Sequence, residues 1–446
     1  MRDIFVTLIF VAGAFLALRR PYYGALLWVW IGLMNPHRMG WGFAYSMPFA
    51  MAAGVVTLLG MIFISKDVRW LKSPALNVLA ALIAWMGITT AFAIHVDPSL
   101  SKFIDVLKVL GMVFLVGSLV RTREEILGLV WVVVLSIGFF GFKGGIFTLT
   151  TGGAHRVWGP PASVVQGNNE LAVALIMCIP LFYFLIQQVA VARQVPLLAR
   201  IPEKWLVRGL YVTILLCVLS AVGSQSRGAF LAIAAMGVVL WWRSRSKLAL
   251  GFAILLLTPT LLMFMPEEWF ARMDTIKTYQ EDASAMGRIN AWTMAVNIAN
   301  DRLLGAGFAT ASPFIYSMYA PDPSYVIVAH SIYFQVLGEH GYVGLALYLL
   351  FWILTYRTAG RLMRVGKEHP EFEWAGQLGA MSKVSLVGFA VGGAFLSLAY
   401  WDMPFYITVA LAAADNLVRN QLAEKASQGA MSVSGVPQHG LQRAAR

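Results

Sequence analysis

Two histidines and a glutamate lie close together in the stretch YVIVAHSIYFQVLGEHGYVGL, at the beginning of a long apolar run: His330, Glu339 and His340. Imidazole and carboxylate groups can hold a metal ion or move a proton. If residues 330–340 form one helix, the two histidines are about 15 Å apart along its axis. Metal ligands on one helix need spacings of three or four residues. We therefore do not expect these three residues to form one metal site.

His330 is the member of this group that could act by itself, because it stands where a polar segment meets the apolar run. An imidazole has an ordinary pKa of about 6.5 and can accept a proton at neutral pH. The alternative is a histidine that caps or packs the end of a helix. The pattern alone leaves both interpretations open.

Three arginines stand alone in segments that are poor in other basic residues: Arg156 in GGAHRVWGPP, Arg227 in GSQSRGAF and Arg288 in AMGRINAW. Arginine keeps its charge and binds phosphate through two parallel hydrogen bonds. A single arginine of this kind commonly snorkels to lipid headgroups or pairs with a carboxylate. Three of them, each beside glycine or serine, indicate a shared purpose. A lipid-linked pyrophosphate would need such a cradle.

Arg227 is the most informative of the three, because it lies in the short polar turn Ser-Gln-Ser-Arg-Gly between two apolar runs. Gly228 permits a close approach of the backbone, and the hydroxyl of Ser226 adds a hydrogen-bond donor. The alternative is a plain hairpin turn between two helices.

The elements that position these residues follow from the composition. Of the 446 residues, 59% are hydrophobic and 13% are charged, against about 45–50% and about 25% in soluble domains. In lipid, the backbone N–H and C=O groups must form hydrogen bonds with one another. The apolar blocks of this chain are long and uniformly apolar, which predicts helices rather than barrel strands. We predict an all-α polytopic membrane protein. The apolar blocks are 3–18, 21–34, 47–65, 74–94, 103–120, 125–148, 170–191, 209–223, 228–242, 248–265, 329–356, 380–398 and 403–417. Counting the first two as one broken pair leaves about twelve transmembrane helices.

The net charge of +12 does not indicate nucleic acid, because the basic residues gather in alternate short loops in the positive-inside pattern. The loops predicted to face the cytoplasm contain residues 19–20, 66–72, 121–123, 193–208, 243–247 and 357–367. The segments predicted to face the other side are 35–46, 95–102, 150–168, 223–228 and 266–328. Cys178 and Cys217 lie inside apolar blocks and are expected to be packing residues.

These assignments divide the chain into four parts: transmembrane helices over 1–265, a long periplasmic loop over 266–328, transmembrane helices over 329–418 and a disordered cytoplasmic tail over 419–446. Loops as long as 266–328 usually carry function. The loop contains a predicted amphipathic helix over 284–300, and the glycines of LLGAGFA after it mark a turn. One face of that helix should carry Ile289, Trp292, Val296 and Ala299.

The motif around the first histidine resembles a family signature. His330-Ser331, nine residues and then GYVG are similar to the H-[NSQ]-x9-G-x-x-G pattern of bacterial O-antigen ligases, whose fold O-antigen polymerases share. The Ser-Arg pair of the polar turn, RINAW and LLGAGFA extend the resemblance. The opening MRDIFVTLIF and the segment NPHRMGWGFA are similar to O-glycosylation ligases found beside exosortase systems. The stretch NDR departs from the family, because many relatives have a proline before the G-x-G turn.

The resemblance implies a membrane glycosyltransferase that moves a glycan from undecaprenyl pyrophosphate to a sugar hydroxyl of lipid A–core. The reaction would occur at the periplasmic face of the bacterial inner membrane, without nucleotide, metal or other cofactor, and would invert the anomeric centre. His330 would be the general base, and Arg227 and Arg288 would bind the pyrophosphate. The further substrate-binding residues expected are Arg156, Ser226, Ser331 and Gly341.

Three alternatives remain. An O-antigen polymerase would use a second lipid-linked glycan as acceptor, and a protein O-oligosaccharyltransferase would use a serine or threonine. A transporter or flippase would be expected to show functional carboxylates or broken helices at membrane mid-depth. Asp105 and Lys108, three residues apart, are expected to pair. Lys143, inside an apolar block, has no role in any of these functions.

Overall fold

The computed structural model describes residues 1–63, 70–193, 199–243, 246–248, 251 and 283–433, and its regular elements in these residues are helices. The first half contains α1 (Arg2–Arg19), α2 (Pro21–Met34), η1 (Pro36–Met39), η2 (Phe43–Ser46), α3 (Phe49–Phe63), α4 (Pro74–Ala91), α5 (Val96–Leu119), α6 (Arg123–Thr150), α7 (Asn168–Gln187) and α8 (Val189–Ala192). The second half contains α10 (Glu203–Gly223), α11 (Arg227–Arg243), α14 (Ala283–Asp301), α15 (Pro313–Tyr319), α16 (Ile332–Glu368), η3 (Pro370–Phe372), α17 (Glu373–Gly393) and α18 (Asp402–Val433).

Each predicted apolar block that falls on described residues coincides with a helix, so the all-α prediction is confirmed for them. Five of these helices, α4, α6, α7, α10 and α16, are long and apolar enough to cross a membrane. Three shorter apolar helices are α2, α3 and residues 227–242 of α11. The total of about twelve crossings stays a prediction, and the predicted span 248–265 lies almost entirely outside the described residues.

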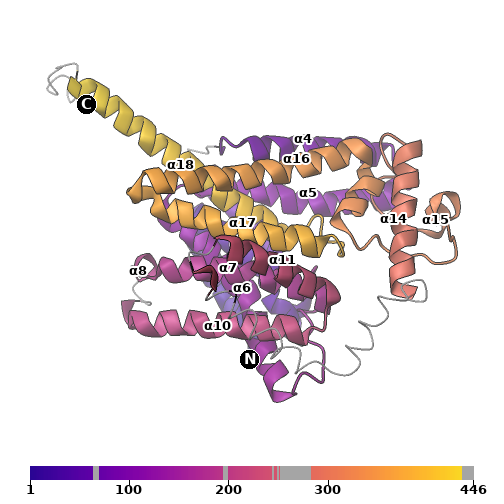
Figure 1. The fold of residues 1–446 in the computed structure, drawn as a ribbon, viewed down its shortest axis with the longest axis horizontal. Helices are drawn as coiled ribbons and strands as arrows, with labels where there is room; N and C mark the ends of the chain where they lie inside the picture. Colours follow the sequence, from indigo (N-terminus) through magenta and orange to yellow (C-terminus); the bar gives the residue numbers. More distant parts are fainter. Residues whose placement is uncertain (64–69, 194–198, 244–245, 249–250, 252–282, 434–446) are drawn as a thin grey trace.

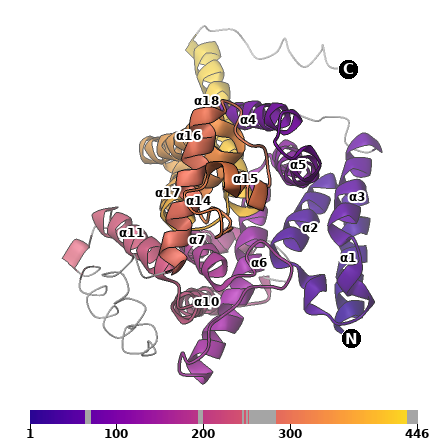
Figure 2. The same cartoon turned by 90° about the vertical axis from the view of Figure 1, so that its right-hand side faces the viewer.

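The long helices form a bundle that α14 and α15 cover at one end. Helices α4, α5, α16 and α17 lie side by side in Figure 1, with α7 and α6 below them, while α14 crosses their right-hand end. Figure 2 looks onto that end and shows α1, α2 and α3 packed together at one flank. Helix α7 lies at the centre, and its residues 171–178 are all fully buried.

The close packing of α6 against α10 depends on glycines of α6. A Cβ added at Gly141 would lie 2.3 Å from the Cys217 sulfur, and one at Gly145 would lie 2.3 Å from the Leu216 carbonyl oxygen. Small residues at such positions let two membrane helices approach through their backbones. Cys217 and Cys178 are buried free thiols, which confirms that they pack rather than form a disulfide.

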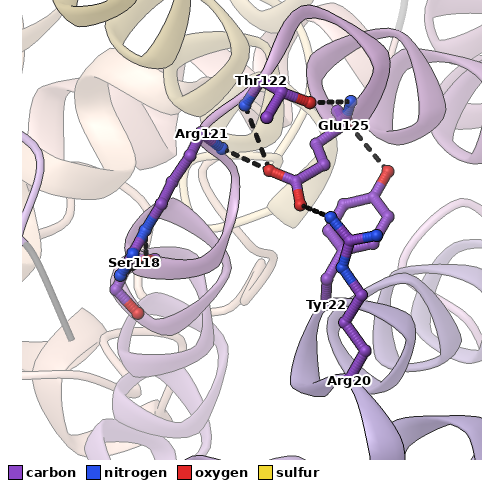
Figure 3. Close-up of polar contacts among 6 residues, drawn as sticks. All are labelled: Arg20, Tyr22, Ser118, Arg121, Thr122 and Glu125. Carbon is purple, nitrogen blue, oxygen red and sulfur yellow. Dashed lines mark hydrogen bonds and ion pairs between the residues drawn. The ribbon is translucent and has the colours of Figure 1, made fainter. Parts of the chain in front are cut away.

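A polar cluster joins the beginnings of α2 and α6 at the end of the bundle opposite α14 (Figure 3). Thr122 caps α6, because its hydroxyl accepts from the Glu125 N–H at 3.3 Å. The Glu125 carboxylate accepts from the N–H groups of Arg121 and Thr122 and forms a 2.6 Å ion pair with Arg20. The Tyr22 hydroxyl donates to the Glu125 carbonyl at 2.9 Å. Two loops with predicted cytoplasmic locations therefore lie together.

The segments predicted to share the other side of the membrane meet at the opposite end. The Ile94 N–H donates to the Ala306 carbonyl at 3.0 Å, and the Val157 N–H donates to the Gly223 carbonyl at 3.1 Å. These bonds join residues 92–98 to the turn after α14, and the loop 151–167 to the α10–α11 turn. The grouping of the loops agrees with the charge pattern, and the side of the membrane on which they lie stays a prediction.

The long loop contains the predicted helix, and its burial follows the predicted stripe only in part. Residues 266–282 lie outside the described part, and α14 spans the predicted helix. Its buried residues Ala291, Met294 and Ile298 pack with Ile315 and Tyr316 of α15. Ile289, which the stripe placed on the buried face, is 40% exposed. Of the other three stripe residues, Ala299 is buried, and Trp292 and Val296 are partly buried. The stripe is therefore confirmed in part, because α14 packs against two partners, α15 and α16.

The prediction of a disordered tail from residue 419 needs correction, because α18 continues as a helix to Val433 (Figure 1). Tertiary contacts stabilise the beginning of this extension. Leu422 packs against the core, and the Lys425 ammonium lies 2.6 Å from the Glu371 carboxylate. Residues 434–446 lie outside the described part.

Helix α16 is interrupted at Gly341, where φ is 66° and ψ is −170°. Gly305 and Gly307, with φ of 67° and 79°, form the predicted turn before it. The N–H groups of Ala306 and Gly307 donate to the carbonyls of Gly338 and Glu339, each at 2.9 Å. A Cβ at Gly341 would lie 2.2 Å from the Leu303 carbonyl oxygen. Gly341 therefore lets the turn dock into the break in the helix.

We expect Gly341→Ala to lower the thermal unfolding midpoint of the purified protein. The backbone region that Gly341 occupies is open almost only to glycine and costs other residues about 1–3 kcal/mol, and the clash with Leu303 adds to this cost. Gly111→Ala in α5 is the matched control, because a Cβ there meets nothing within 4 Å. Equal midpoints for the two variants would contradict a structural role for Gly341.

Candidate active site

The α10–α11 turn presents Arg227 at the first residue of α11. Gln225 has a positive φ of 55°, which reverses the chain sharply between the two helices. The hydroxyl of Ser226 accepts from the Ala229 N–H at 3.2 Å and so caps α11. A helix N-terminus carries partial positive charge and free N–H groups. The polar turn is thus both a hairpin and a suitable place for an anion.

The loop 151–167 brings a second arginine to this turn. The Arg156 guanidinium donates to the Gln225 side-chain oxygen at 3.4 Å, and the Gln225 amide donates to the Gly153 carbonyl at 3.1 Å. From the start of α7, the Asn168 amide donates to the Ser224 carbonyl at 2.7 Å. These side-chain bonds hold the loop and the two helices in one arrangement.

Arg288 on α14 completes a group of three. Arg156, Arg227 and Arg288 line one cavity of about 160 Å³, and each of the three is partly buried. We call this cavity the arginine pocket; its other lining residues are Asn168, Asn169, Gln225, Ser226, Gly228, Ser284, Phe395 and Leu396. The structure thus brings together four predicted site residues from three separate segments, Ser226 being the fourth.

Trp292, one helical turn after Arg288, anchors α14 to the segment that contains the histidine. Its ring stacks on Phe334 with the centroids 5.0 Å apart, and its indole N–H donates to the Ala329 carbonyl at 2.7 Å. The spacing in RINAW therefore fixes Arg288 relative to His330.

His330 lies just before α16, which begins at Ile332 rather than at residue 329 as predicted. Its φ of 44° is in the left-handed region, and its N–H donates to the Ser397 hydroxyl at 3.0 Å. Burial, together with the positive charge of Arg288, lowers the pKa of His330 below its ordinary value. The imidazole is therefore a neutral proton acceptor at neutral pH and lies near one of the three arginines.

His340 has a different role from His330. It is fully buried inside α16, where its Nδ1 lies 2.7 Å from the Thr89 hydroxyl and its ring packs edge-on against Phe308. The Trp85 indole donates to the His340 carbonyl at 2.9 Å, beside the break at Gly341. His340 thus joins α4 to α16 as a packing residue, and its position separates it from the arginine pocket.

Glu339 lines a second cavity, of about 490 Å³. Its carboxylate accepts from the Tyr400 hydroxyl at 2.5 Å and from the Gln335 amide at 3.4 Å. We call this cavity the Glu339 pocket; its other polar lining residues are Ser101, Lys102, Asp105, Thr310, Gln335 and Ser397. Asp105 also pairs with Lys108 at 3.1 Å, as predicted. Ala329 precedes His330 in the chain, and the Ser397 hydroxyl accepts from the His330 N–H. Both Ala329 and Ser397 line this pocket.

Three predicted site residues, His330, Ser331 and Gly341, lie outside the lining of both pockets. Ser331 is buried at the N-cap of α16, and Gly341 lies at the break in that helix. Conversely, Asn168, Asn169 and Gln225 line the arginine pocket without having been predicted. The sequence does hold a signal for the two asparagines, since adjacent polar amides begin an otherwise apolar run.

Comparison with known proteins gives two family matches. Residues 212–349 match a family model described as O-Antigen ligase, and residues 1–190 match one described as a family of unknown function (DUF5935). None of the curated proteins matches the chain significantly. The first match contains Arg227, Arg288 and His330, and supports a ligase- or polymerase-type enzyme of the membrane. The resemblance read from the sequence is therefore confirmed over residues 212–349, which match the O-antigen ligase family.

Proposed function

We propose that the protein is an O-antigen ligase that transfers a glycan from undecaprenyl pyrophosphate to a sugar hydroxyl of lipid A–core, at the periplasmic face of the inner membrane. The convergence of Arg156, Arg227 and Arg288 on one cavity beside His330 carries this proposal. Arginine keeps its charge and binds phosphate oxygens through two parallel hydrogen bonds, so three arginines in one partly buried pocket suit a pyrophosphate.

The arginine pocket would hold the pyrophosphate that becomes the leaving group. In the reaction, the acceptor hydroxyl oxygen forms a bond to the anomeric carbon while the bond between that carbon and the pyrophosphate oxygen breaks. The electron pair of the broken bond leaves with undecaprenyl pyrophosphate, where the arginines and the N-terminus of α11 stabilise the developing charge. A single displacement of this kind inverts the anomeric centre.

His330 would accept the proton of the acceptor hydroxyl. Its lowered pKa keeps the imidazole neutral before the substrates bind. When the pyrophosphate offsets the charge of Arg288, one cause of that lowering weakens, and the imidazole becomes a stronger base. Donor binding would thus prepare the base for the transfer.

The Glu339 pocket would hold the acceptor sugar. Residues 395–397 lie between the two cavities: Phe395 and Leu396 line the arginine pocket, and Ser397 lines the Glu339 pocket. Carboxylate, amide and hydroxyl groups are suitable partners for sugar hydroxyls. His330, bonded to Ser397 through its backbone, would then stand at the boundary of donor and acceptor.

The pH dependence should reflect the lowered pKa of His330. Below that pKa the imidazole is protonated and cannot accept a proton, so kcat/KM should fall as the pH decreases through a value below about 6.5. Arg288→Gln removes one cause of the lowering, and its acidic limb should move to higher pH. If the acidic limb lies at the same pH in wild type and Arg288→Gln, Arg288 does not lower the pKa of His330.

The acceptor is tested by deleting the gene and identifying the lost glycoconjugate by mass spectrometry. We expect lipid A–core to lose its long glycan while undecaprenyl-pyrophosphate-linked glycan of full length accumulates. Loss of glycan chain length would instead identify a polymerase, and loss of glycan from protein would identify an O-oligosaccharyltransferase. Re-expression of the wild-type gene, but not of His330→Ala, should restore the conjugate.

A further inference from the structure

A third cavity, of about 650 Å³, lies away from the proposed active site, and its lining comes from α1, α2, residues 36–45, α6 and Pro161. Three cations line it, Arg2, Arg38 and Lys143, with no acidic residue. We call it the basic-aromatic cavity. All of its lining residues fall in the segment 1–190, which matches the family of unknown function.

Lys143 is the member of this group that most needs a partner. It lies in α6, a helix long and apolar enough to cross a membrane, seven residues before the end at Thr150, or about 10 Å along the axis. Its side chain is exposed, and within the described residues it forms no ion pair or hydrogen bond. A charge at such a depth is expensive and usually serves a function.

The other two cations do not meet a carboxylate in the cavity either. Arg38 stacks over the Tyr45 ring at 4.7 Å. Beside Arg2, the Asp3 carboxylate is turned to the loop, where it accepts from the Ala44 N–H at 3.2 Å. The three positive charges therefore remain available to an anion from outside the chain.

The rest of the wall is suited to a lipid chain. Phe5 and Phe139 are 65% and 41% exposed at the cavity, and Trp41 is 95% exposed. Tryptophan and tyrosine favour the headgroup level of a membrane, where an apolar ring meets a polar environment. Cations beside aromatic and aliphatic walls match an amphiphile whose headgroup is anionic.

We propose that the basic-aromatic cavity binds one anionic membrane phospholipid, with its phosphate among Arg2, Arg38 and Lys143 and an acyl chain along Phe139. The proposal does not depend on the transfer reaction. The bound lipid would contact Pro161, which belongs to the same loop, 151–167, that supplies Arg156 to the arginine pocket. Its occupancy would therefore support the position of that loop.

The test is to titrate the purified full-length protein in detergent with phosphatidylglycerol and to measure bound lipid by native mass spectrometry. Wild type should hold one tightly bound phosphatidylglycerol and should bind zwitterionic phosphatidylethanolamine at least about tenfold more weakly. Lys143→Gln and Arg38→Gln should each weaken phosphatidylglycerol binding roughly ten- to hundred-fold, the usual effect of losing a charge-assisted contact. Arg208→Gln is the matched control, because Arg208, like Arg38, lies over an aromatic ring, that of Trp205 at 5.2 Å, but does not line the cavity.

Three results would overturn the proposal. Equal affinity of wild type and Lys143→Gln would show that the cations do not hold a headgroup. Displacement of the lipid by millimolar inorganic phosphate would show a site for a soluble anion. If Lys143→Gln weakened undecaprenyl pyrophosphate binding and left phosphatidylglycerol unaffected, the cavity would serve the donor instead.

Discussion

Replacing His330 with alanine should reduce kcat by about 10²–10⁴-fold, the usual contribution of a positioned general base, while the donor binds nearly as in wild type. The expectation follows from the proposed roles: His330 adjoins Ala329 and Ser397 of the Glu339 pocket and feels the charge of Arg288. In the variant, three arginines are left to hold the pyrophosphate. The measurements are single-turnover transfer at saturating donor and direct binding of undecaprenyl pyrophosphate. The acidic limb of the pH–rate profile should disappear in the same variant.

Two controls separate proton transfer from other roles of the histidine. His340→Ala should lower thermal stability, because its buried ring packs from α16 against Thr89 of α4 and Phe308, but folded protein should keep the acidic limb. Glu339→Gln should weaken acceptor binding more than it changes that limb. If His330→Ala abolishes donor binding and keeps turnover at saturation, the histidine is a pyrophosphate ligand, and Glu339 becomes the first candidate for the base.

Alanine at Arg227 or Arg288 should weaken binding of undecaprenyl pyrophosphate roughly ten- to hundred-fold. A charge-assisted contact to phosphate contributes about 1.5–3 kcal/mol, which corresponds to that range of affinity. Lysine at either position should restore part of the affinity, because it keeps the charge but lacks the two parallel donors. Arg156→Ala should have a smaller effect, since Arg156 also donates to Gln225.

The matched control for these substitutions is Arg208→Ala, which removes an exposed arginine of α10 that does not line the arginine pocket. Binding should be measured with undecaprenyl pyrophosphate and with undecaprenyl monophosphate at several salt concentrations. The arginine variants should reduce the preference for pyrophosphate. An unchanged preference in both Arg227→Ala and Arg288→Ala would mean that the pocket does not hold the donor.

Much of the fold could be predicted from the sequence. Unpaired backbone groups and charges in lipid cost free energy, and this cost depends on each segment alone rather than on its tertiary contacts. Apolar blocks therefore predicted helices, and arginines outside the basic loops were recognisable as exceptions before any contact was known. The polar turn at Arg227 and the isolated His330 were identified in the same way, and the H-[NSQ]-x9-G-x-x-G resemblance indicated their family.

Which of these residues meet was decided only by the tertiary structure. Arg156 contacts Gln225, 69 residues further along the chain, and His340 contacts Thr89, 251 residues earlier. The periodicity of a sequence does not predict pairs that are so far apart. The same limit explains the burial pattern of α14, which packs against α15 and α16. It also explains the helical extension of α18, where Leu422 packs against the core and Lys425 pairs with Glu371. It also explains Gly341, whose need for glycine comes from the Leu303 carbonyl that docks against it. Hydropathy and spacing determine what each segment can be, whereas contacts between distant segments determine which polar groups share a cavity.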